Sequence, residues 1–274
     1  MKLVSWNMAH RAEAWFHLLK CDFDIALLQE AAVPPHDVAT AVGVDDAPWV
    51  TAGDGASRQW RTAVANLSLA HEVRWFSPRT IEAAGADDLA VSRLGSLAAA
   101  TVTLPTGEEV ILVSVYGTWE RPRKSTGSSW IYADASVHRV VSDLSYFIGQ
   151  QSGHRIIVAG DLNILFGYGE SGSPYWAARY QTVFDRMALL GLQFVGPQAP
   201  HGRMADPWPD HELPRDSRNV PTFHTNRQNP ETATRQLDFV FASTALCDRV
   251  QVTALNDPES WGPSDHCMVE IEVS

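Results

Sequence analysis

The chain has 274 residues, 45% of them hydrophobic, so it can bury a sizeable core and is too apolar to be disordered throughout. Its formal net charge of −11 excludes a protein that coats nucleic acid non-specifically, because the surface as a whole repels phosphate. The charge does not exclude a nuclease, since a bound cation and a few arginines can reverse the field at one site.

The first half of the chain is dominated by short apolar runs. Residues 3–6 and 25–29 predict buried strands, and residues 11–20 between them carry apolar side chains at helical spacing. Further strands are predicted at 49–52, 62–68, 72–76, 97–104 and 109–116, the last two joined as a hairpin through Pro105-Thr106-Gly107.

In the second half, helices are predicted at 132–148 and 175–190, with a strand at 155–159 between them and strands at 236–242 and 267–273. Residues 196–221 form a long irregular stretch, which is typical of a binding loop or a mobile one. Strands outnumber helices and cluster in runs, which favours an α+β fold. We expect a single domain over residues 1–274.

No apolar stretch is long enough for a signal peptide or a membrane span, so we expect no membrane insertion and a cytoplasmic location. The three cysteines are too few for a disulfide framework and lack zinc-ligand spacing. They are therefore expected to be buried free thiols.

Polar side chains stand at the ends of several predicted strands. Hydrophobic burial alone would not place them there, and oxygen ligands of this kind suit a hard cation such as Mg²⁺, while a histidine can transfer protons. Asp161 and Asn163 are two residues apart, so an extended backbone would point both to the same side. Asp238 lies inside an apolar strand and needs a partner, because an unpaired buried carboxylate is very costly.

These short motifs follow the order found in one large superfamily. In chain order they are Trp6-Asn7, Gln29-Glu30, Tyr116, Gly160-Asp161-Leu162-Asn163, Thr222-Phe223, Gln236-Leu237-Asp238-Phe239 and Ser264-Asp265-His266. The chain therefore resembles the endonuclease/exonuclease/phosphatase superfamily, which includes exonuclease III-type and DNase I-type nucleases, inositol polyphosphate 5-phosphatases and sphingomyelinases. The resemblance implies a four-layered α/β-sandwich, with two packed, mainly antiparallel β-sheets flanked by helices and the site at one edge.

The resemblance also implies a metal centre. Glu30 is the expected principal Mg²⁺ ligand, with Asn7 supporting the ion from the adjacent strand end. Asp265 is expected in the metal shell or in the neighbouring hydrogen-bond network. Mn²⁺ is the alternative metal.

The remaining motif residues are expected to act on water and phosphate. The resemblance implies that Asp161 orients or deprotonates the attacking water and that Asn163 holds a phosphate oxygen. It implies that Asp238 hydrogen-bonds the His266 imidazole, which contacts the scissile phosphate or activates water. Tyr116 matches a position near the phosphate in exonuclease III-like enzymes.

Substrate specificity is expected to come from the loops. Arg121 and Arg123, beside Lys124, form the densest basic cluster and could grip a phosphate, although a solvated loop explains them equally well. Arg61, with Arg58 and Trp60 before it, could flank the site. Trp176 offers a stacking surface, but core packing explains it as well; Trp208 and His211 in the long loop offer similar surfaces.

The sequence thus predicts a Mg²⁺-dependent phosphoesterase that hydrolyses phosphodiester bonds by in-line attack of an activated water, with a nuclease favoured. The expected partner is a phosphate-ester substrate such as nucleic acid, and no protein partner is indicated. A phosphatase or phosphodiesterase of a small phosphorylated metabolite or lipid head group is the alternative, which the acidic charge favours. A catalytically inactive binding module is a third reading, which the retention of Glu30, Asp161 and His266 disfavours.

Overall fold

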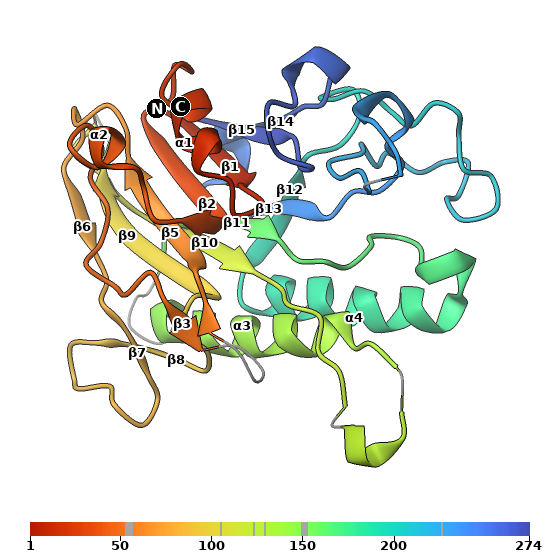
Figure 1. Ribbon diagram of the computed structural model, residues 1–274, viewed down its shortest axis with the longest axis horizontal. Coiled ribbons are helices and arrows are strands. Elements are labelled where there is room, and N and C mark those ends of the chain that lie inside the picture. Colours follow the sequence, from red (N-terminus) through yellow and green to blue (C-terminus); the bar gives the residue numbers. More distant parts are fainter. Residues whose placement is uncertain (53–56, 105, 123, 129, 149–152, 226) are drawn as a thin grey trace.

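The computed structural model describes residues 1–274 except 53–56, 105, 123, 129, 149–152 and 226. Two β-sheets face each other across an apolar core, and helices cover the outer face of each sheet (Figure 1). The predicted α+β fold with four layers is therefore confirmed.

The first sheet has five strands in the order β14-β15-β1-β2-β5. β1 and β2 run parallel, so that Asn7 at the end of β1 pairs with Gln29 on β2, next to Glu30. The other neighbours are antiparallel. In sheet order the strands span Val250–Leu255, Met268–Val273, Lys2–Asn7, Ile25–Ala32 and Trp60–Asn66.

The second sheet has six strands in the order β12-β13-β11-β10-β9-β6. β10 and β11 run parallel, which pairs Tyr116 with Asp161, and antiparallel β13 pairs Asp238 with the same Asp161. Three predicted site residues thus lie side by side on adjacent strands. In sheet order the strands span Leu192–Gly196, Asp238–Ser243, Ile156–Asp161, Glu109–Tyr116, Leu97–Thr103 and Val73–Trp75.

The strand alternation distributes side chains between the layers. On β1, Leu3 packs between the sheets, whereas Val4 and Trp6 pack on the opposite face against α1. α1 (Ala12–Leu18) and α2 (His36–Ala39) cover the first sheet, and α3 (Ala133–Ile148) and α4 (Pro174–Leu189) cover the second. Shorter elements are β3 (Thr51–Ala52) with β4 (Ser57–Arg58), β7 (Pro78–Thr80) with β8 (Leu89–Val91), and 3-10 turns at Lys124–Thr126, Glu170–Gly172, Pro230–Thr232, Cys247–Arg249 and Pro258–Ser260.

Two longer strands were not expected from the sequence. β12 and β14 each stand at the edge of a sheet. β12 follows directly on the turn at Gly191 and has only a short apolar run, so its sequence does not stand out from the loop that follows. β14 alternates exposed or half-buried residues with buried Val252 and Ala254, and this pattern is that of an edge strand with one face on the core.

The segment from 197 to 237 is irregular apart from one 3-10 turn in the part that the structure describes, but its ends are anchored. The buried Gln236 side chain accepts from the Val220 N–H and donates to the Pro197 carbonyl, at 3.0 and 2.9 Å. Asn256 donates to the Pro221 and Arg203 carbonyls. Side-chain hydrogen bonds therefore take the place of a sheet in fixing this loop.

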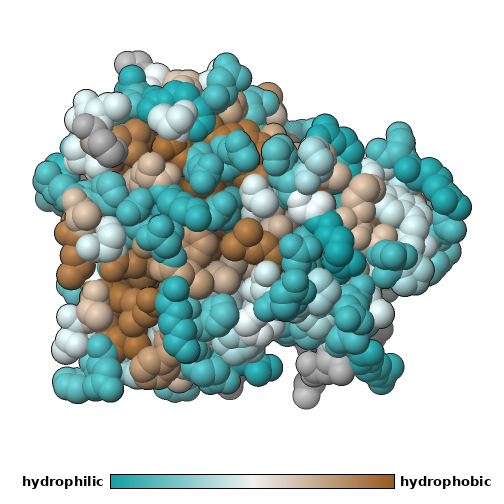
Figure 2. Space-filling model, turned by 90° about the horizontal axis from the view of Figure 1, so that it is seen from above, coloured by the Kyte–Doolittle hydropathy of each residue, from teal (hydrophilic) through white to brown (hydrophobic). Residues whose placement is uncertain are grey.

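Seen from above, the surface is mostly hydrophilic, with apolar side chains visible towards one side of the molecule (Figure 2). Among the described residues, no helix has the length and apolar character needed to cross a membrane.

Gly160 on β11 allows the two central strands of the second sheet to approach each other. A Cβ at this position would lie 1.9 Å from the Val115 carbonyl oxygen of β10. A glycine is therefore required here by the packing of β11 against β10.

We expect Gly160→Ala to lower the free energy of unfolding by at least about 1–3 kcal/mol, the usual cost of overpacking a core. Gly85→Ala is the matched control, because its Cβ would meet Asp88 at an ordinary 3.4 Å. Urea denaturation of both variants measures the difference. Equal stability of the two variants would contradict the packing argument.

Candidate active site

A cleft of about 320 Å³ opens where β1, β2, β10 and β11 end. It brings together every predicted catalytic and metal residue except Asp238, which lies behind His266. The larger hollow lined by Glu109 and Arg155 lies away from all of them. The cleft is lined by Asn7, Glu30, Arg58, Trp60, Tyr116, Thr118, Trp119, Asp161, Asn163, Phe223, Asp265 and His266.

Asp161 is fully buried and is held from both sheets. Asn7 Nδ2 donates to Asp161 Oδ2 at 2.9 Å, which links β1 of the first sheet to β11 of the second. Asn163 donates twice, from its backbone N–H to Oδ1 at 2.8 Å and from Nδ2 to Oδ2 at 2.9 Å. A carboxylate has about four acceptor positions, so one of them is left for a water or a substrate proton.

The backbone after Asp161 is not extended, contrary to the geometry expected from the sequence. Asn163 has φ 53°, and the chain turns back so that the Asn163 side chain also donates to the Gly117 carbonyl at 2.9 Å. Asparagine tolerates this left-handed conformation better than most residues. Asn163 therefore meets Asp161 through a turn rather than through strand alternation.

Asp238 and His266 form the second buried pair of the site. Their Oδ2 and Nδ1 atoms lie 2.8 Å apart, so the imidazole presents Nε2 to the cleft, 3.8 Å from Asp161 Oδ2. The Thr222 hydroxyl accepts from the backbone N–H of Asp238, and the Phe223 ring packs 4.9 Å from the imidazole. Thr222 and Phe223 thus orient the pair from behind.

Burial and unbalanced charge perturb both groups. Burial raises the pKa of Asp161 to about 8; His266 opposes the rise, and the carboxylates of Asp238 and Glu30 add to it. Burial lowers the pKa of His266, but Asp238 and Asp161 outweigh it and raise that pKa to about 10. The imidazole is therefore protonated at neutral pH, while Asp161 is able to exchange a proton near neutrality.

Glu30 reaches the cleft from an irregularity in β2. The pairing of β2 with β5 shifts register between Leu28 and Ala31, and Glu30 has φ 46°. A bulge of this kind re-aims a side chain. Burial acts to raise the pKa of Glu30, but contacts with His10 and the Tyr116 hydroxyl, and the charge of His266, hold it below its usual value. Glu30 is therefore ionised and available to a cation.

Tyr116 is tied to the same carboxylate. Burial raises the pKa of the Tyr116 phenol well above its usual value, and the charges of Glu30 and Asp161 raise it further. The hydroxyl thus keeps its proton and serves as a hydrogen-bond donor to Glu30.

Arg61 does not reach the cleft, which corrects the expectation that it binds substrate. Its guanidinium is buried, with Nη1 2.8 Å from Asp45 Oδ2 and its centre 4.1 Å from the Trp49 ring centroid. Successive side chains on a strand point to opposite sides, so it is the preceding Trp60, together with Arg58, that faces the site.

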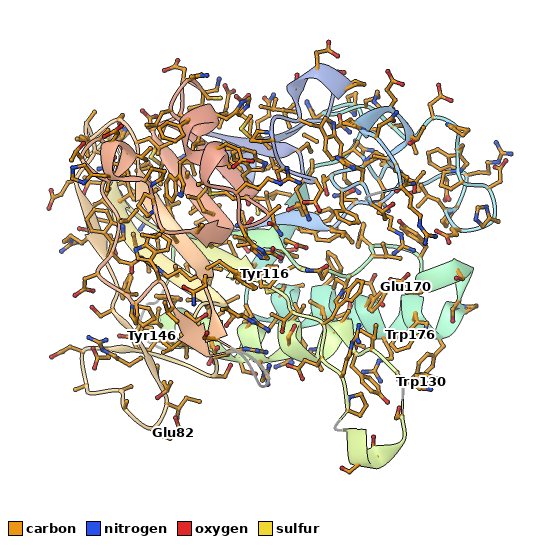
Figure 3. The ribbon with its side chains drawn as sticks, viewed as in Figure 1. Glu82, Tyr116, Trp130, Tyr146, Glu170 and Trp176 are labelled. Atoms are coloured by element: carbon orange, nitrogen blue, oxygen red, sulfur yellow. The ribbon has the colours of Figure 1, made fainter. Side chains whose placement is uncertain are left out.

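Of the other predicted substrate residues, Arg121 and Trp176 lie outside the cleft lining. Arg121 is exposed, and Arg123 lies outside the described residues. Trp176 lies on α4 with Trp130 beside it, away from Tyr116 (Figure 3). Trp208 packs against the core of the second sheet, and His211 is exposed.

Three cleft or rim residues escaped the sequence reasoning: His10, Thr118 and Trp119. Trp119 is half exposed on the rim, and His10 contacts Glu30. The available signal was position, because His10 follows Asn7 by three residues and Trp119 follows Tyr116 by three. A residue three positions after a strand end that carries a site residue stays near the site, because each residue extends the chain by only about 3.5 Å.

Fold and site together define a hydrolase of phosphate esters that is built at the joint edge of two packed sheets. The chain belongs to the Endonuclease/Exonuclease/phosphatase family, which it matches over residues 4–266. This membership confirms the resemblance noted in the sequence and the expectation of a phosphoesterase. No curated protein matches the chain.

Solved structures of nucleases share the fold. The endonuclease domain of TRAS1, a telomere-specific non-LTR retrotransposon, is 17% identical over 99% of this chain and 97% of its own, with TM-score 0.62. The AP endonuclease LMAP from Leishmania major is 14% identical over 99% and 87%, with TM-score 0.60. The 3'-5' exonuclease NExo from Neisseria meningitidis is 16% identical over 100% of both chains, with TM-score 0.55.

The charge of Asp238 makes the largest contribution to raising the pKa of His266, so Asp238→Asn should lower the pKa of the imidazole. We expect this shift in an NMR titration of the metal-free protein, together with a loss of about 10²–10³ in phosphodiesterase rate. Asp248→Asn, on the surface, is the control. An unchanged His266 titration in folded Asp238→Asn would contradict the electrostatic account.

Proposed function

We propose that the chain is a divalent-metal-dependent nuclease that hydrolyses phosphodiester bonds by in-line attack of water. The observation that carries the proposal is the facing pair of Asp161, with one acceptor position left, and His266, held as an imidazolium by Asp238. Asp161 can accept a proton, and the His266 imidazolium can neutralise negative charge on a phosphate. Asp161 Oδ2 and His266 Nε2 lie 3.8 Å apart. The family match from 4 to 266 supports one domain over 1–274, which stays a prediction, as does the cytoplasmic location.

The donor set fits a cation. Asp161, Glu30 and Asp265 line one cleft, and Asp238 lies behind His266. Burial raises the pKa of Asp161, and the negative charges of Asp238 and Glu30 add to the rise. Glu30 and Asp265, with the Asn7 amide oxygen, are the proposed ligands. Mg²⁺ suits such oxygen atoms, and Mn²⁺ is the alternative.

A second group could also hold an ion. Ligand atoms of Asp161, Asp238 and His266 lie within 4.8 Å of one another. However, His266 Nδ1 and Asp238 already bind each other, and the raised pKa of His266 means that its imidazole carries a proton. We therefore assign the resident cation to Glu30 and its neighbours.

The chain's own residues divide the reaction between them. Asp161 uses its remaining acceptor position to orient the water and take its proton, for which a pKa raised towards neutrality is suitable. His266 Nε2 donates to a non-bridging phosphate oxygen rather than accepting the proton of the water. Asn163 and Tyr116 fix Asp161 and Glu30 respectively. Glu30, Asp265 and Asn7 would hold a cation, which would supply Lewis-acid polarisation of the phosphoryl oxygen and stabilisation of the leaving oxygen.

An aromatic surface outside the cleft lining supports a polymeric substrate, which would extend past the cleft. Trp119 on the rim and Trp130 beyond it are both about half exposed. Trp130 lies 5.8 Å from Trp176, and the Arg179 guanidinium lies 5.5 Å from the Trp176 ring (Figure 3). Such rings stack on unpaired bases without regard to sequence. The three solved structures that share the fold are, by their names, two endonucleases and an exonuclease.

The alternative of a small phosphorylated metabolite or lipid head group is favoured by one observation, the net charge of −11. An inactive binding module is the weakest alternative, because the catalytic pairs are complete and in contact.

Asp161→Asn tests the chemistry. With Mg²⁺ or Mn²⁺, we expect the wild type to cleave single- or double-stranded DNA, abasic duplex or RNA, and the variant to be slower by about 10²–10³ or more while folding normally. EDTA should abolish cleavage. Activity confined to inositol phosphates or other monomeric phosphates would reject the nuclease, and near wild-type turnover of Asp161→Asn would reject the assignment of the base.

Trp130→Ala tests the aromatic surface. Losing one stacked base removes about 1–3 kcal/mol of binding, so we expect KM for single-stranded nucleic acid to rise about tenfold. Hydrolysis of a small chromogenic phosphodiester should not change, since it does not extend beyond the cleft. Phe16→Ala, an exposed aromatic on α1, is the control. If the wild type, Trp130→Ala and Phe16→Ala had the same KM, the aromatic surface would have no part in substrate binding.

A further inference from the structure

We propose that His10 is a further ligand of the cation, so that its imidazole nitrogen joins the carboxylate and amide oxygens and the site prefers Mn²⁺ to Mg²⁺. This inference rests on the metal site of the proposed function. It concerns a residue outside the shared sequence motifs, and it begins from the contact between His10 Nε2 and Glu30 Oε2.

The backbone of His10 is fixed to the two nearest proposed ligands. The His10 N–H donates to the Glu30 carbonyl at 3.0 Å, and the preceding Ala9 N–H donates to Asn7 Oδ1 at 2.9 Å. The turn closes through Arg11 N–H, which donates to the Met8 carbonyl at 2.9 Å. The position of His10 is therefore set by the same atoms that build the metal site.

This turn is held in a conformation that its residues do not favour. Ala9 and His10 have φ 47° and 61°, which is the left-handed region normally taken by glycine or asparagine in such turns. Two consecutive residues with β-carbons remain there only if the surroundings over-determine them. The hydrogen bonds to Asn7 and Glu30 do this, and they point the His10 side chain at the cleft.

Stacking then fixes the ring itself. The His10 imidazole lies 4.9 Å from the Trp60 ring at an interplanar angle of 12°, and Trp60 in turn meets Tyr116 edge-on at 5.1 Å. Tyr116 also holds Glu30. A closed chain of contacts thus runs from His10 through Trp60 and Tyr116 to Glu30 and back to His10, although the His10 side chain itself is about half exposed.

The contact leaves a cation two possibilities. An ion that binds Glu30 on the side of His10 must either displace the imidazole or take the place of the proton that Nε2 shares with Glu30, which is then released to solvent. Displacement would break the Trp60 stacking while the backbone of His10 stays tied, so ligation is the outcome that keeps the most contacts. Imidazole suits Mn²⁺ and later transition metals better than it suits Mg²⁺, which prefers oxygen and keeps its water.

The test is direct metal binding to the full-length, metal-free protein. Isothermal titration with MnCl₂ and MgCl₂ should show that His10→Ala weakens Mn²⁺ binding by at least about tenfold. Mg²⁺ binding should change much less. His211→Ala, an exposed histidine outside the cleft lining, is the matched control and should behave as the wild type.

Pulsed EPR of bound Mn²⁺ gives an independent readout. The wild type should show nitrogen coupling from a ligating imidazole, and His10→Ala should lose it. Unchanged coupling and Mn²⁺ affinity in His10→Ala would overturn the inference. If His10→Ala bound both metals more tightly than the wild type, the inference would also be overturned. His10 would then compete with the cation for Glu30 instead of binding the cation.

These outcomes are separable from failure of the proposed function. Nitrogen-ligated Mn²⁺ in a protein that cleaves no nucleic acid would uphold the ligand and reject the nuclease. Cleavage by a protein whose Mn²⁺ signal carries no His10 nitrogen would do the reverse.

Discussion

The site depends on one hydrogen bond between the two sheets, from Asn7 Nδ2 to Asp161 Oδ2. Each residue ends a strand of a parallel pair, β1 with β2 and β10 with β11, so the carboxyl ends of four strands meet at one edge. A second tie lies just below, where the buried Gln29 side chain donates to Ser114 at 3.0 Å. Apolar packing alone would hold the two sheets together, because it is not directional. The polar links also fix the position of one sheet relative to the other, since a hydrogen bond forms only at a defined distance and angle.

The same joining of sheets creates the electrostatics of catalysis. Carboxylates from strands of both sheets are buried at one place, and the cost of that burial appears as the raised pKa of Asp161. The charges of Asp238 and Asp161 raise the pKa of His266 against the effect of its own burial. A cation, and an imidazolium paired with Asp238, relieve the cost of burying the carboxylates. The buried carboxylates and the imidazolium are costly for the stability of the fold. They are also the groups that binding a cation and a phosphate ester would require.

Much of this could be predicted from the sequence, because strand ends are visible as apolar runs followed by Asn, Glu or Asp. The helices at 132–148 and 175–190 were expected almost to the residue, since their apolar stripes are long. Single side-chain directions could not be predicted. The turn at Asn163, the bulge at Glu30 and the inward direction of Arg61 depend on pairing with distant strands and on Asp45, which periodicity does not describe.

The central claim is that Asn7 and Asp161 act as one unit across the two sheets. A double-mutant cycle in single-turnover cleavage tests it, with Asn7→Ala, Asp161→Ala and the double variant compared under saturating metal. The account predicts that each single variant loses at least about 10² in rate and that the double variant loses no more than the worse of the two. Losses that multiply would contradict it, because the two residues would then contribute independently.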